Sequence, residues 1–308
     1  MKKRIVFLTV LALCLALTGC ATRPSSPATA EPPAATTAPA ATTAPAEAGT
    51  PEPPSTVPDP TPAPEKNGMY DLLSDMFDSY HFGIAGSTLT GARYAASIVD
   101  WSVTNGADAV RAGAGAWDRG LENEYGEKLT DKLGSLYSMA LSFYGAGTNV
   151  LSDCGWEGEW TCTGSDVHTA FRQIYAGLGL DAPRMIRVYY PDSDVMYLRA
   201  QGVELPASAK DLTEDLNNGL SGLVLEGESR ILSAELYDDG ELRLDLNDAA
   251  AAQIRSYGTS GESLTIRSSV NTALEFVSAA DRVTLTVNGG LLETGHNIYD
   301  YPMTFTEE

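Results

Sequence analysis

Two cysteines close together in the chain are the residues best suited to covalent chemistry. Cys154 and Cys162 enclose the stretch Gly-Trp-Glu-Gly-Glu-Trp-Thr, whose two glycines would let so short a loop close. In an oxidising compartment this arrangement favours a disulfide, which would stabilise the fold by roughly 2–3 kcal/mol. Two buried thiols are one alternative. A zinc site is the other and would draw on His168, His81 or His296, but the sequence has neither Cys-x₂-Cys nor His-x₃-His spacing.

The four tryptophans are the next candidates, because an indole ring can stack against a ligand. Trp156 and Trp160 lie on the loop between the two cysteines and form a candidate contact surface. Trp101 and Trp117 each lie beside an aspartate, so that pair could stack against sugar rings. A tryptophan at helical spacing is more often packed in a core, and the sequence favours the core for Trp101 and Trp117.

Acidic side chains are numerous, but no motif gathers them into a recognisable site. The chain has 41 Asp and Glu against 20 Lys and Arg, so pairs such as Glu157 and Glu159 arise by chance. Asp192 and Asp194 could touch a calcium ion, but a full calcium loop needs several more oxygens and a closing acid. The sequence contains no Gly-x-Ser-x-Gly, Walker or His-Glu-x-x-His motif. We therefore predict no catalytic residue, no metal and no cofactor, and a protein that is not an enzyme.

Cys20 follows a segment with the features of a secretion signal. Residues 2–4 are basic, and residues 5–17 are apolar except for Thr9. That length suits a signal peptide and falls short of the roughly 20 residues of a membrane-spanning helix. The Leu-Thr-Gly-Cys sequence that ends at Cys20 resembles the bacterial lipobox, which implies a diacylated Cys20 as the first residue of the mature chain. A plain signal peptide is the alternative. We expect a chain held by its N-terminal lipid on the extracytoplasmic face of the cell membrane.

A segment rich in proline, alanine and threonine comes next. Residues 21–66 hold thirteen of the 17 prolines and no aromatic residue. Such a composition cannot bury enough apolar surface to offset the entropy lost on folding. We therefore expect a disordered, extended linker.

The overall composition limits the classes of protein to consider. At 308 residues the chain has room for about two domains, and 43% hydrophobic with 20% charged residues is ordinary for a soluble globular protein. These values exclude collagen and a polytopic membrane protein. The net charge of −21 opposes binding to nucleic acid, whose protein partners carry clustered basic surfaces.

Residues 67–183 have the apolar spacing of short helices. Apolar residues recur every three or four positions, and glycines fall at the proposed joints. We predict four or five helices packed as a small bundle, without resemblance to a known family. The apolar stripes begin near residues 72, 94, 107, 129 and 167.

From Met185 onward the pattern changes to alternating strands and helices. The Asp-Asp-Gly sequence at 238–240 separates two apolar runs and predicts a hairpin. The order β-α-β-β-α-β predicts an α/β sandwich with helices on one face of a sheet. The predicted elements are strand 186–190, helix 208–220 with Ser208 as its N-cap, strands 231–237 and 241–246, helix 263–277 and strand 283–287.

Several pieces of sequence in this region carry a family resemblance. They are residues 188–192, Asp215 with Leu216 and Gly219, residues 242–246, residues 271–276 and residues 282–289. In order and spacing, residues 184–300 resemble the GerMN domain, the sporulation and spore-germination domain of bacterial envelope lipoproteins. Two positions depart from the family, which often has Pro where Leu220 stands and Ser where Asn247 stands. The resemblance implies a binding or assembly module with no established catalytic site.

These features together predict an α+β protein in four parts: a signal peptide at 1–20, a linker at 21–66, a helical module at 67–183 and a GerMN-like domain at 184–308. We expect a non-catalytic, lipid-anchored envelope protein that acts in sporulation, germination or envelope construction. Its partner would be an envelope protein or a peptidoglycan component. The alternatives are a peptidoglycan-acting enzyme with its site in the helical module and a sensory partner of a membrane signalling complex. A cleft with converging carboxylates would favour the enzyme.

Overall fold

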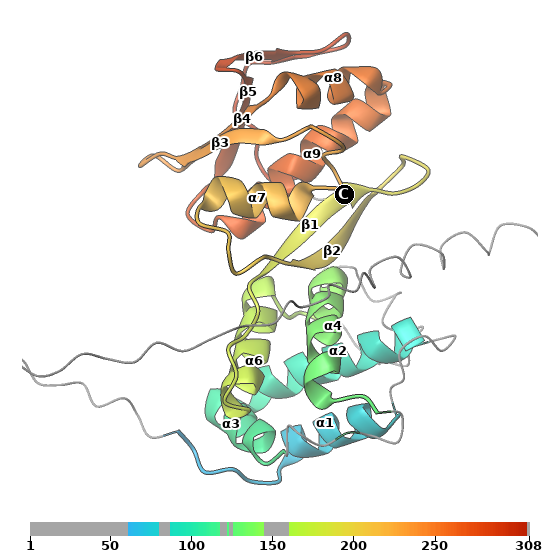
Figure 1. The fold of residues 1–308 in the computed structure, drawn as a ribbon, viewed down its shortest axis with the longest axis vertical. Helices are drawn as coiled ribbons and strands as arrows, with labels where there is room; N and C mark the ends of the chain where they lie inside the picture. Colours follow the sequence, from blue (N-terminus) through green and yellow to red (C-terminus); the bar gives the residue numbers. More distant parts are fainter. Residues whose placement is uncertain (1–60, 80–86, 118–121, 123–125, 145–159, 307–308) are drawn as a thin grey trace, which may run out of the picture. The chain divides into compact units, whose positions relative to one another are not determined.

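The computed structural model describes residues 61–79, 87–117, 122, 126–144 and 160–306 (Figure 1). The chain divides by its internal contacts into Met1–Val57 and Pro58–Glu308, and all described residues belong to the second unit. The predicted signal peptide and most of the predicted linker therefore lie outside the described residues. Within the described part of the chain, none of the helices is both long enough and apolar enough to cross a bilayer.

Short helices form the first part of the described chain, as the apolar spacing predicts. One of them begins with a complete capping box, in which the Thr163 hydroxyl accepts the backbone N–H of Asp166 while the Asp166 carboxylate accepts the N–H of Thr163. The helices are α1 (Gly68–Ser79), α2 (Ser87–Asn105), α3 (Ala107–Gly115), α4 (Leu129–Phe143) and α6 (Gly164–Gly177).

The apolar stripes of these helices meet in one core. Tyr137 of α4 stacks on Phe171 of α6 with ring centroids 4.7 Å apart and planes 3° from parallel. Lys132 is also fully buried there, and its ammonium group forms an ion pair with Glu127 at 3.1 Å. Other members include Leu73, Phe77, Ile98, Leu133, Leu136 and Ile174.

Two sheets and three helices form the second part. A hairpin of β1 (Met185–Pro191) and β2 (Leu198–Glu204) is one sheet. The other has five strands in the order β3-β4-β5-β6-β7, with β4 and β5 parallel and the remaining neighbours antiparallel. The elements after the hairpin are α7 (Leu212–Leu220), β3 (Ile231–Leu236), β4 (Glu241–Leu246), α8 (Asp248–Ser256), α9 (Thr259–Phe276), β5 (Arg282–Val287), β6 (Gly290–Glu293) and β7 (Ile298–Tyr299).

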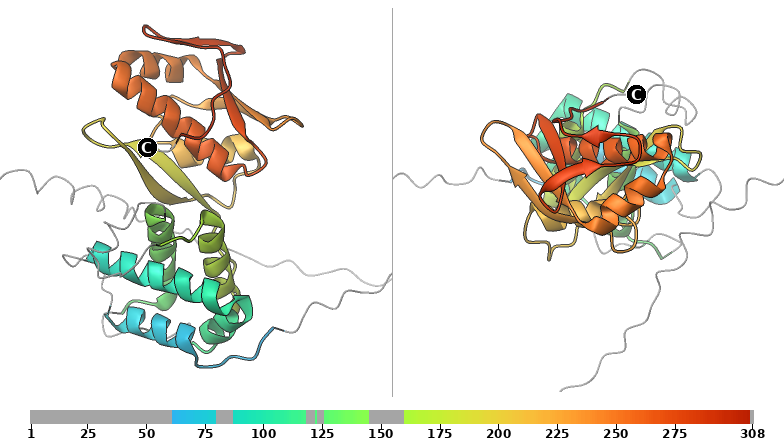
Figure 2. Two further views of the ribbon diagram at one scale, coloured as in Figure 1. Left: turned by 180° about the vertical axis from the view of Figure 1, so that it is seen from behind. Right: turned by 90° about the horizontal axis from the view of Figure 1, so that it is seen from above.

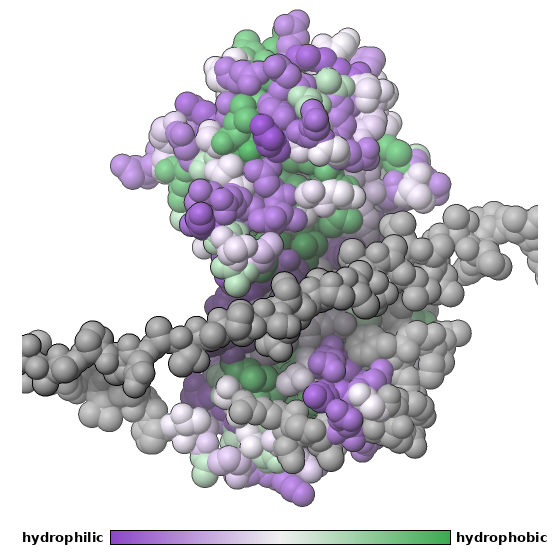
Figure 3. Space-filling model, viewed as in Figure 1, coloured by the Kyte–Doolittle hydropathy of each residue, from purple (hydrophilic) through white to green (hydrophobic). Residues whose placement is uncertain are grey.

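Helices of this part pack on the apolar faces of the strands. In β4, Leu242, Leu244 and Leu246 are buried and alternate with more exposed positions, so one face of the strand enters the core. α7 packs against β3, whereas α9 packs against both β1 and β5 (Figures 1 and 2). On the face drawn in Figure 3, hydrophilic residues cover most of the described surface, with hydrophobic ones scattered among them.

The mixed helix-and-sheet class is confirmed, with corrections in its detail. The six predicted elements of the second part are present, but the strands form two sheets, and the structure adds β2, α8, β6 and β7. Ser208 is not the N-cap of α7, which begins four residues later. Asp211 takes that role, because its carboxylate accepts the backbone N–H of Glu214 at 2.9 Å.

Candidate functional site

The cysteines chosen from the sequence lie mostly outside the described residues. This holds for Cys20 and for Cys154, so the lipidation and the disulfide remain predictions. Cys162 is described, lies partly buried, and packs against the helical core just before α6. Burial raises the pKa of its thiol.

The tryptophans divide between the core and one cavity. Trp156 lies outside the described residues, and Trp160 is only 9% exposed, so the expectation of an exposed contact surface at Trp160 is wrong. Trp117 packs on the Tyr70 and Phe77 rings at centroid distances of 5.4 and 5.3 Å, as expected for a core residue. Trp101 packs partly on the same core and also lines a cavity.

The cavity at Trp101 has a volume of about 470 Å³ and lies between α1 and α2. Three carboxylates line it, those of Asp71, Asp75 and Asp100. Asp75 is already engaged, because its carboxylate accepts the Tyr94 hydroxyl at 2.8 Å. At this cavity the structure brings an indole and several carboxylates together.

One of the two aspartates after β1, Asp192, serves a turn. Asp192 accepts the backbone N–H groups of Met196 and Tyr197 at 2.7 and 3.1 Å, and these bonds lower its pKa. Its carboxylate therefore closes the connection between β1 and β2. Among the described residues, no group of three or more His, Cys, Asp or Glu side chains is placed to hold a metal ion.

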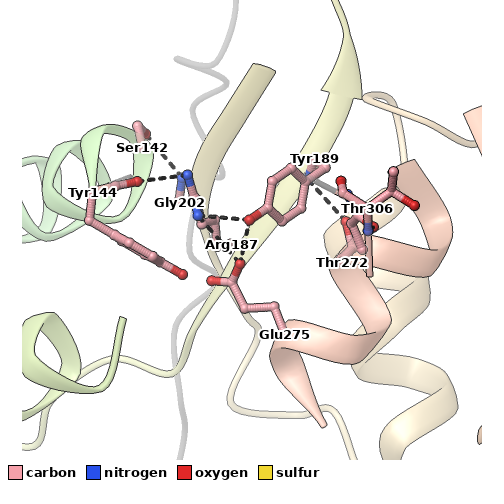
Figure 4. Close-up of polar contacts among 9 residues, drawn as sticks. Ser142, Tyr144, Arg187, Tyr189, Gly202, Thr272, Glu275 and Thr306 are labelled. Carbon is pink, nitrogen blue, oxygen red and sulfur yellow. Dashed lines mark hydrogen bonds and ion pairs between the residues drawn. The ribbon is translucent and has the colours of Figure 1, made fainter. Parts of the chain in front are cut away.

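A buried charged cluster that sequence reasoning missed lies where β1 meets α9. Arg187 of β1 approaches Glu275 of α9 at 3.4 Å, and the hydroxyl of Tyr189 lies between them. That hydroxyl accepts from Arg187 at 2.7 Å and donates to Glu275 at 2.6 Å (Figure 4). We call these three side chains the polar junction.

Burial dominates the electrostatics of the polar junction. The Arg187 and Glu275 side chains are only 9% and 23% exposed. Burial raises the pKa of Glu275 to about 8 and lowers that of Arg187. The cation opposes the rise at Glu275, but 3.4 Å is a long contact and the guanidinium is shared with other partners. We therefore expect Glu275 to hold its proton far above the ordinary range of a carboxyl.

The polar junction also reaches the helical module. Arg187 donates to the backbone carbonyl of Tyr144 at 2.8 Å and stacks over the Tyr144 ring at 4.0 Å. Beside it, Gly202 of β2 donates to Ser142 at 3.2 Å (Figure 4). Gly202 also accepts from Ser138 at 2.6 Å. The β1–β2 hairpin is thus hydrogen-bonded to the C-terminal half of α4.

In the polar junction, the charge of Glu275 is coupled to its contacts with Arg187 and Tyr189. The cluster is buried, and its donors and acceptors are largely used by one another. A change in the protonation of Glu275 would alter its contacts with Tyr189 and Arg187 of β1. In sequence, Arg187 and Glu275 are 88 positions apart and look like ordinary polar positions of a strand and a helix.

Comparison with known proteins relates the second part to one family. Residues 187–293 match the Germane family, described as sporulation and spore germination. The chain therefore carries a Germane domain, related to the GerMN domain, over those residues. All three residues of the polar junction lie within the match, and Tyr144 lies outside it.

Two solved structures are similar to part of the chain. One holds the tandem GerMN domains of the sporulation protein GerM from Bacillus subtilis, with 21% identity and a TM-score of 0.34 over 40% of this chain and 46% of that chain. The other is the first GerMN domain of the same protein, with 20% identity and a TM-score of 0.30 over 40% of this chain and 94% of that chain. The chain thus spans under half the length of the tandem structure. A search of the curated proteins found no match.

Proposed function

We propose that this chain is a lipid-anchored, non-catalytic protein of the cell envelope that binds a partner in sporulation, spore germination or envelope construction. The observation that carries the proposal is the Germane domain at residues 187–293. The partner is an envelope protein or a peptidoglycan component, and the membrane is reached through the lipid on Cys20.

Structural use of the domain's buried acids supports a non-catalytic role. Glu262 is fully buried, and one of its oxygens accepts from Thr294, Asn297 and Tyr299 at 2.8–3.1 Å. Glu275 is occupied within the polar junction in the same manner. Both acids therefore make contacts within the fold, which supports a non-catalytic role.

The anchor is tested by replacing the acylated cysteine. Cys20→Ala is expected to release the protein from membranes or to leave it unprocessed, because the thiol that carries the lipid is gone. Cys14→Ala is the matched control, since Cys14 lies within the segment that cleavage removes. Mass analysis of the mature N-terminus gives the direct measurement. A chain that begins at Ala21 or later without lipid contradicts the anchor.

The partner is tested by cross-linking in intact cells, followed by capture of the tagged chain and identification of bound material. The matched control carries residues 1–66 fused to an unrelated soluble domain, so that it shares the proposed anchor and linker. We expect an envelope protein or a wall fragment with the full chain only. Identical material from both baits contradicts the proposal.

A second function is favoured by the cavity beside Trp101. An indole with carboxylates around a cavity of about 470 Å³ is a plausible arrangement for cleaving a wall glycan. Purified peptidoglycan incubated with the chain would then release soluble fragments, and Asp100→Asn would stop the release while Asp78→Asn, outside the cavity lining, would not. Such a result would replace the non-catalytic proposal by an enzyme.

A further inference from the structure

A second cavity lies along α9 in the Germane-domain part of the chain. It has a volume of about 360 Å³ and runs between one face of the helix and the segment that follows β7. The helix contributes positions spaced three or four apart, as expected for a single face. We call this cavity the α9 groove; its lining includes Ser263, Ile266, Arg267, Val270, Tyr301 and Met303.

Arg267 is the charged residue of the α9 groove. Its Nε is buried and has no hydrogen-bond partner, and the guanidinium forms no ion pair with any described residue. Arg184 and Arg282, by contrast, each pair with a carboxylate. The chain has a net charge of −21, so carboxylates outnumber cations, and yet the guanidinium of Arg267 has no carboxylate partner. At a cavity wall such a group is suited to bind an anion from a ligand.

Nearby acids of the helix do not supply that anion. Glu262 lies one turn before Arg267, but its bonded oxygen takes its donors from Thr294, Asn297 and Tyr299. Arg267 thus lines the groove together with tyrosines, polar side chains and apolar side chains. Arg267 is the only basic residue among the described residues that line it.

Both walls of the groove are fixed by hydrogen bonds. Met303 exchanges two backbone bonds of 2.7 Å with Val283 of β5. Thr306 lies three residues after Met303 and is bonded to the Asn271 side chain of α9. That side chain accepts from the backbone N–H of Thr306 at 3.1 Å and donates to its carbonyl at 3.0 Å. The cavity therefore exists before any ligand arrives, which lowers the entropy lost on binding.

The floor suits an apolar group. Ile266 and Val270 are 3% and 2% exposed, and Met303 is half-buried beside them. A ligand that fits would place an anion on Arg267 and an apolar group against Met303, with the buried Ile266 and Val270 behind it. A volume of about 360 Å³ is at the small end of ligand sites and fits a molecule the size of a blocked dipeptide.

We propose that the α9 groove binds a ligand carrying one carboxylate next to an apolar group, the chemistry of the C-terminus of a short peptide. A single guanidinium offers one bidentate pair, which matches a carboxylate. A phosphate dianion would need further cations, and the surrounding negative charge would repel it. The inference goes beyond the proposed function, because it names a ligand class and its place.

The test uses the purified chain with two probes, N-acetyl-Ala-Leu and its C-terminal carboxamide. Calorimetry should detect binding of the acid and at least tenfold weaker binding of the amide. Arg267→Gln should weaken binding of the acid by at least tenfold, since it removes the cation and keeps the length of the side chain. The matched control is Arg230→Gln, which removes the same charge at an exposed position outside the groove lining and should leave the affinity unchanged.

Four results would overturn the proposal. Equal binding of acid and amide would remove the role of the carboxylate, and an unchanged affinity in Arg267→Gln would remove the role of the guanidinium. Absence of binding at millimolar acid would exclude this ligand class, as would binding that appears only in a chain shortened to residues 1–306, since the carboxylate would then be this chain's own. The cross-linking test of the proposed function is unaffected by any of these results.

Discussion

At Glu275, burial destabilises the charged carboxylate more than the neighbouring hydrogen-bond donors stabilise it, and the stability of the protein should therefore depend on pH. The folded pKa of about 8 lies above the ordinary value of 4.5, so the folded state holds the proton over a range where the unfolded state has lost it. Stability is therefore complete below pH 4.5 and is lost as the pH rises through 8, by about 1–2 kcal/mol after allowance for Arg187.

We predict that Glu275→Gln flattens this part of the stability curve, because the amide resembles the neutral carboxyl. Denaturant unfolding between pH 5 and 9 provides the measurement. Glu228→Gln, at an exposed position, is the control and should keep the slope of the parent chain. If Glu275→Gln instead destabilises the chain equally at pH 5 and pH 9, the ion pair with Arg187 governs the site.

His168 titrates in the opposite sense. Its ring nitrogen lies 2.5 Å from the Tyr137 hydroxyl, and burial, aided by the charge of Arg172, lowers its pKa to about 4. The unfolded state takes up the proton near pH 6.5, whereas the folded state resists until about pH 4. Stability is thus present above pH 6.5 and is lost as the pH falls toward 4, by roughly 2–3 kcal/mol.

We predict that His168→Gln reduces this loss, because the amide cannot be protonated in that range and can still bond to Tyr137. Every tryptophan lies between residues 101 and 160, so tryptophan fluorescence reports on the helical part of the chain. His296→Gln, at an exposed position, serves as the control. An acid transition unaltered by His168→Gln would assign the loss to other groups.

Some helices and strands can be predicted from the sequence more reliably than others. β4 alternates leucines with polar residues and follows an Asp-Asp-Gly turn, so its bounds of Glu241 and Leu246 could be predicted correctly. β2 carries Arg199, Gln201 and Gly202 in a polar stretch, and it is a strand because it pairs with β1 and packs on α4. Sequence periodicity carries no signal of such a long-range contact.

The candidate site also combines features that have a local sequence signal with features that depend on long-range contacts. The Germane resemblance rests on local pieces and could be predicted, whereas the polar junction joins residues 88 positions apart. Its burial is the property that makes it distinctive, and burial of a charged side chain depends on the packed fold. The cavity at Trp101 shows the intermediate case: Trp101 with its neighbour Asp100 could be chosen from the sequence, and the approach of Asp71 and Asp75 from α1 could not.

Gly202 tests the packing of β2 on α4, and Gly134 of α4 provides a comparison. A methyl group on Gly202 would lie 2.7 Å from the Ser138 Cα and 2.8 Å from its carbonyl oxygen, so Gly202→Ala should push the strand from the helix and cost about 1–3 kcal/mol. Gly134, inside α4, has room for a methyl group, with Tyr175 4.0 Å away. Gly134→Ala should stabilise by about 0.5–1 kcal/mol through helix propensity. Thermal unfolding measures both, and a neutral Gly202→Ala would contradict the close contact.

At the scale of the whole described chain, the apolar residues form two clusters. Met185 belongs to the cluster of the helical part, and Ile186 belongs to that of the second part, so the division falls inside β1. Each cluster receives the apolar faces of its own helices. The contacts between the two parts include the hydrogen bonds from β1 and β2 to α4 and the stacking of Arg187 on the Tyr144 ring. A boundary at residue 184 remains a prediction to be tested by cutting the chain there.

We predict that residues 184–308 fold alone, because one apolar cluster lies wholly within them and about 125 residues can support a core. Circular dichroism should show cooperative unfolding, at a lower midpoint than in the full chain because the bonds to α4 are lost. Gly202→Ala supplies a matched control. In the fragment Ser138 is absent, so the substitution should cost far less there than in the full chain. A fragment without a cooperative transition would show that the second cluster needs the helical part to fold, and the boundary at 184 would then be wrong.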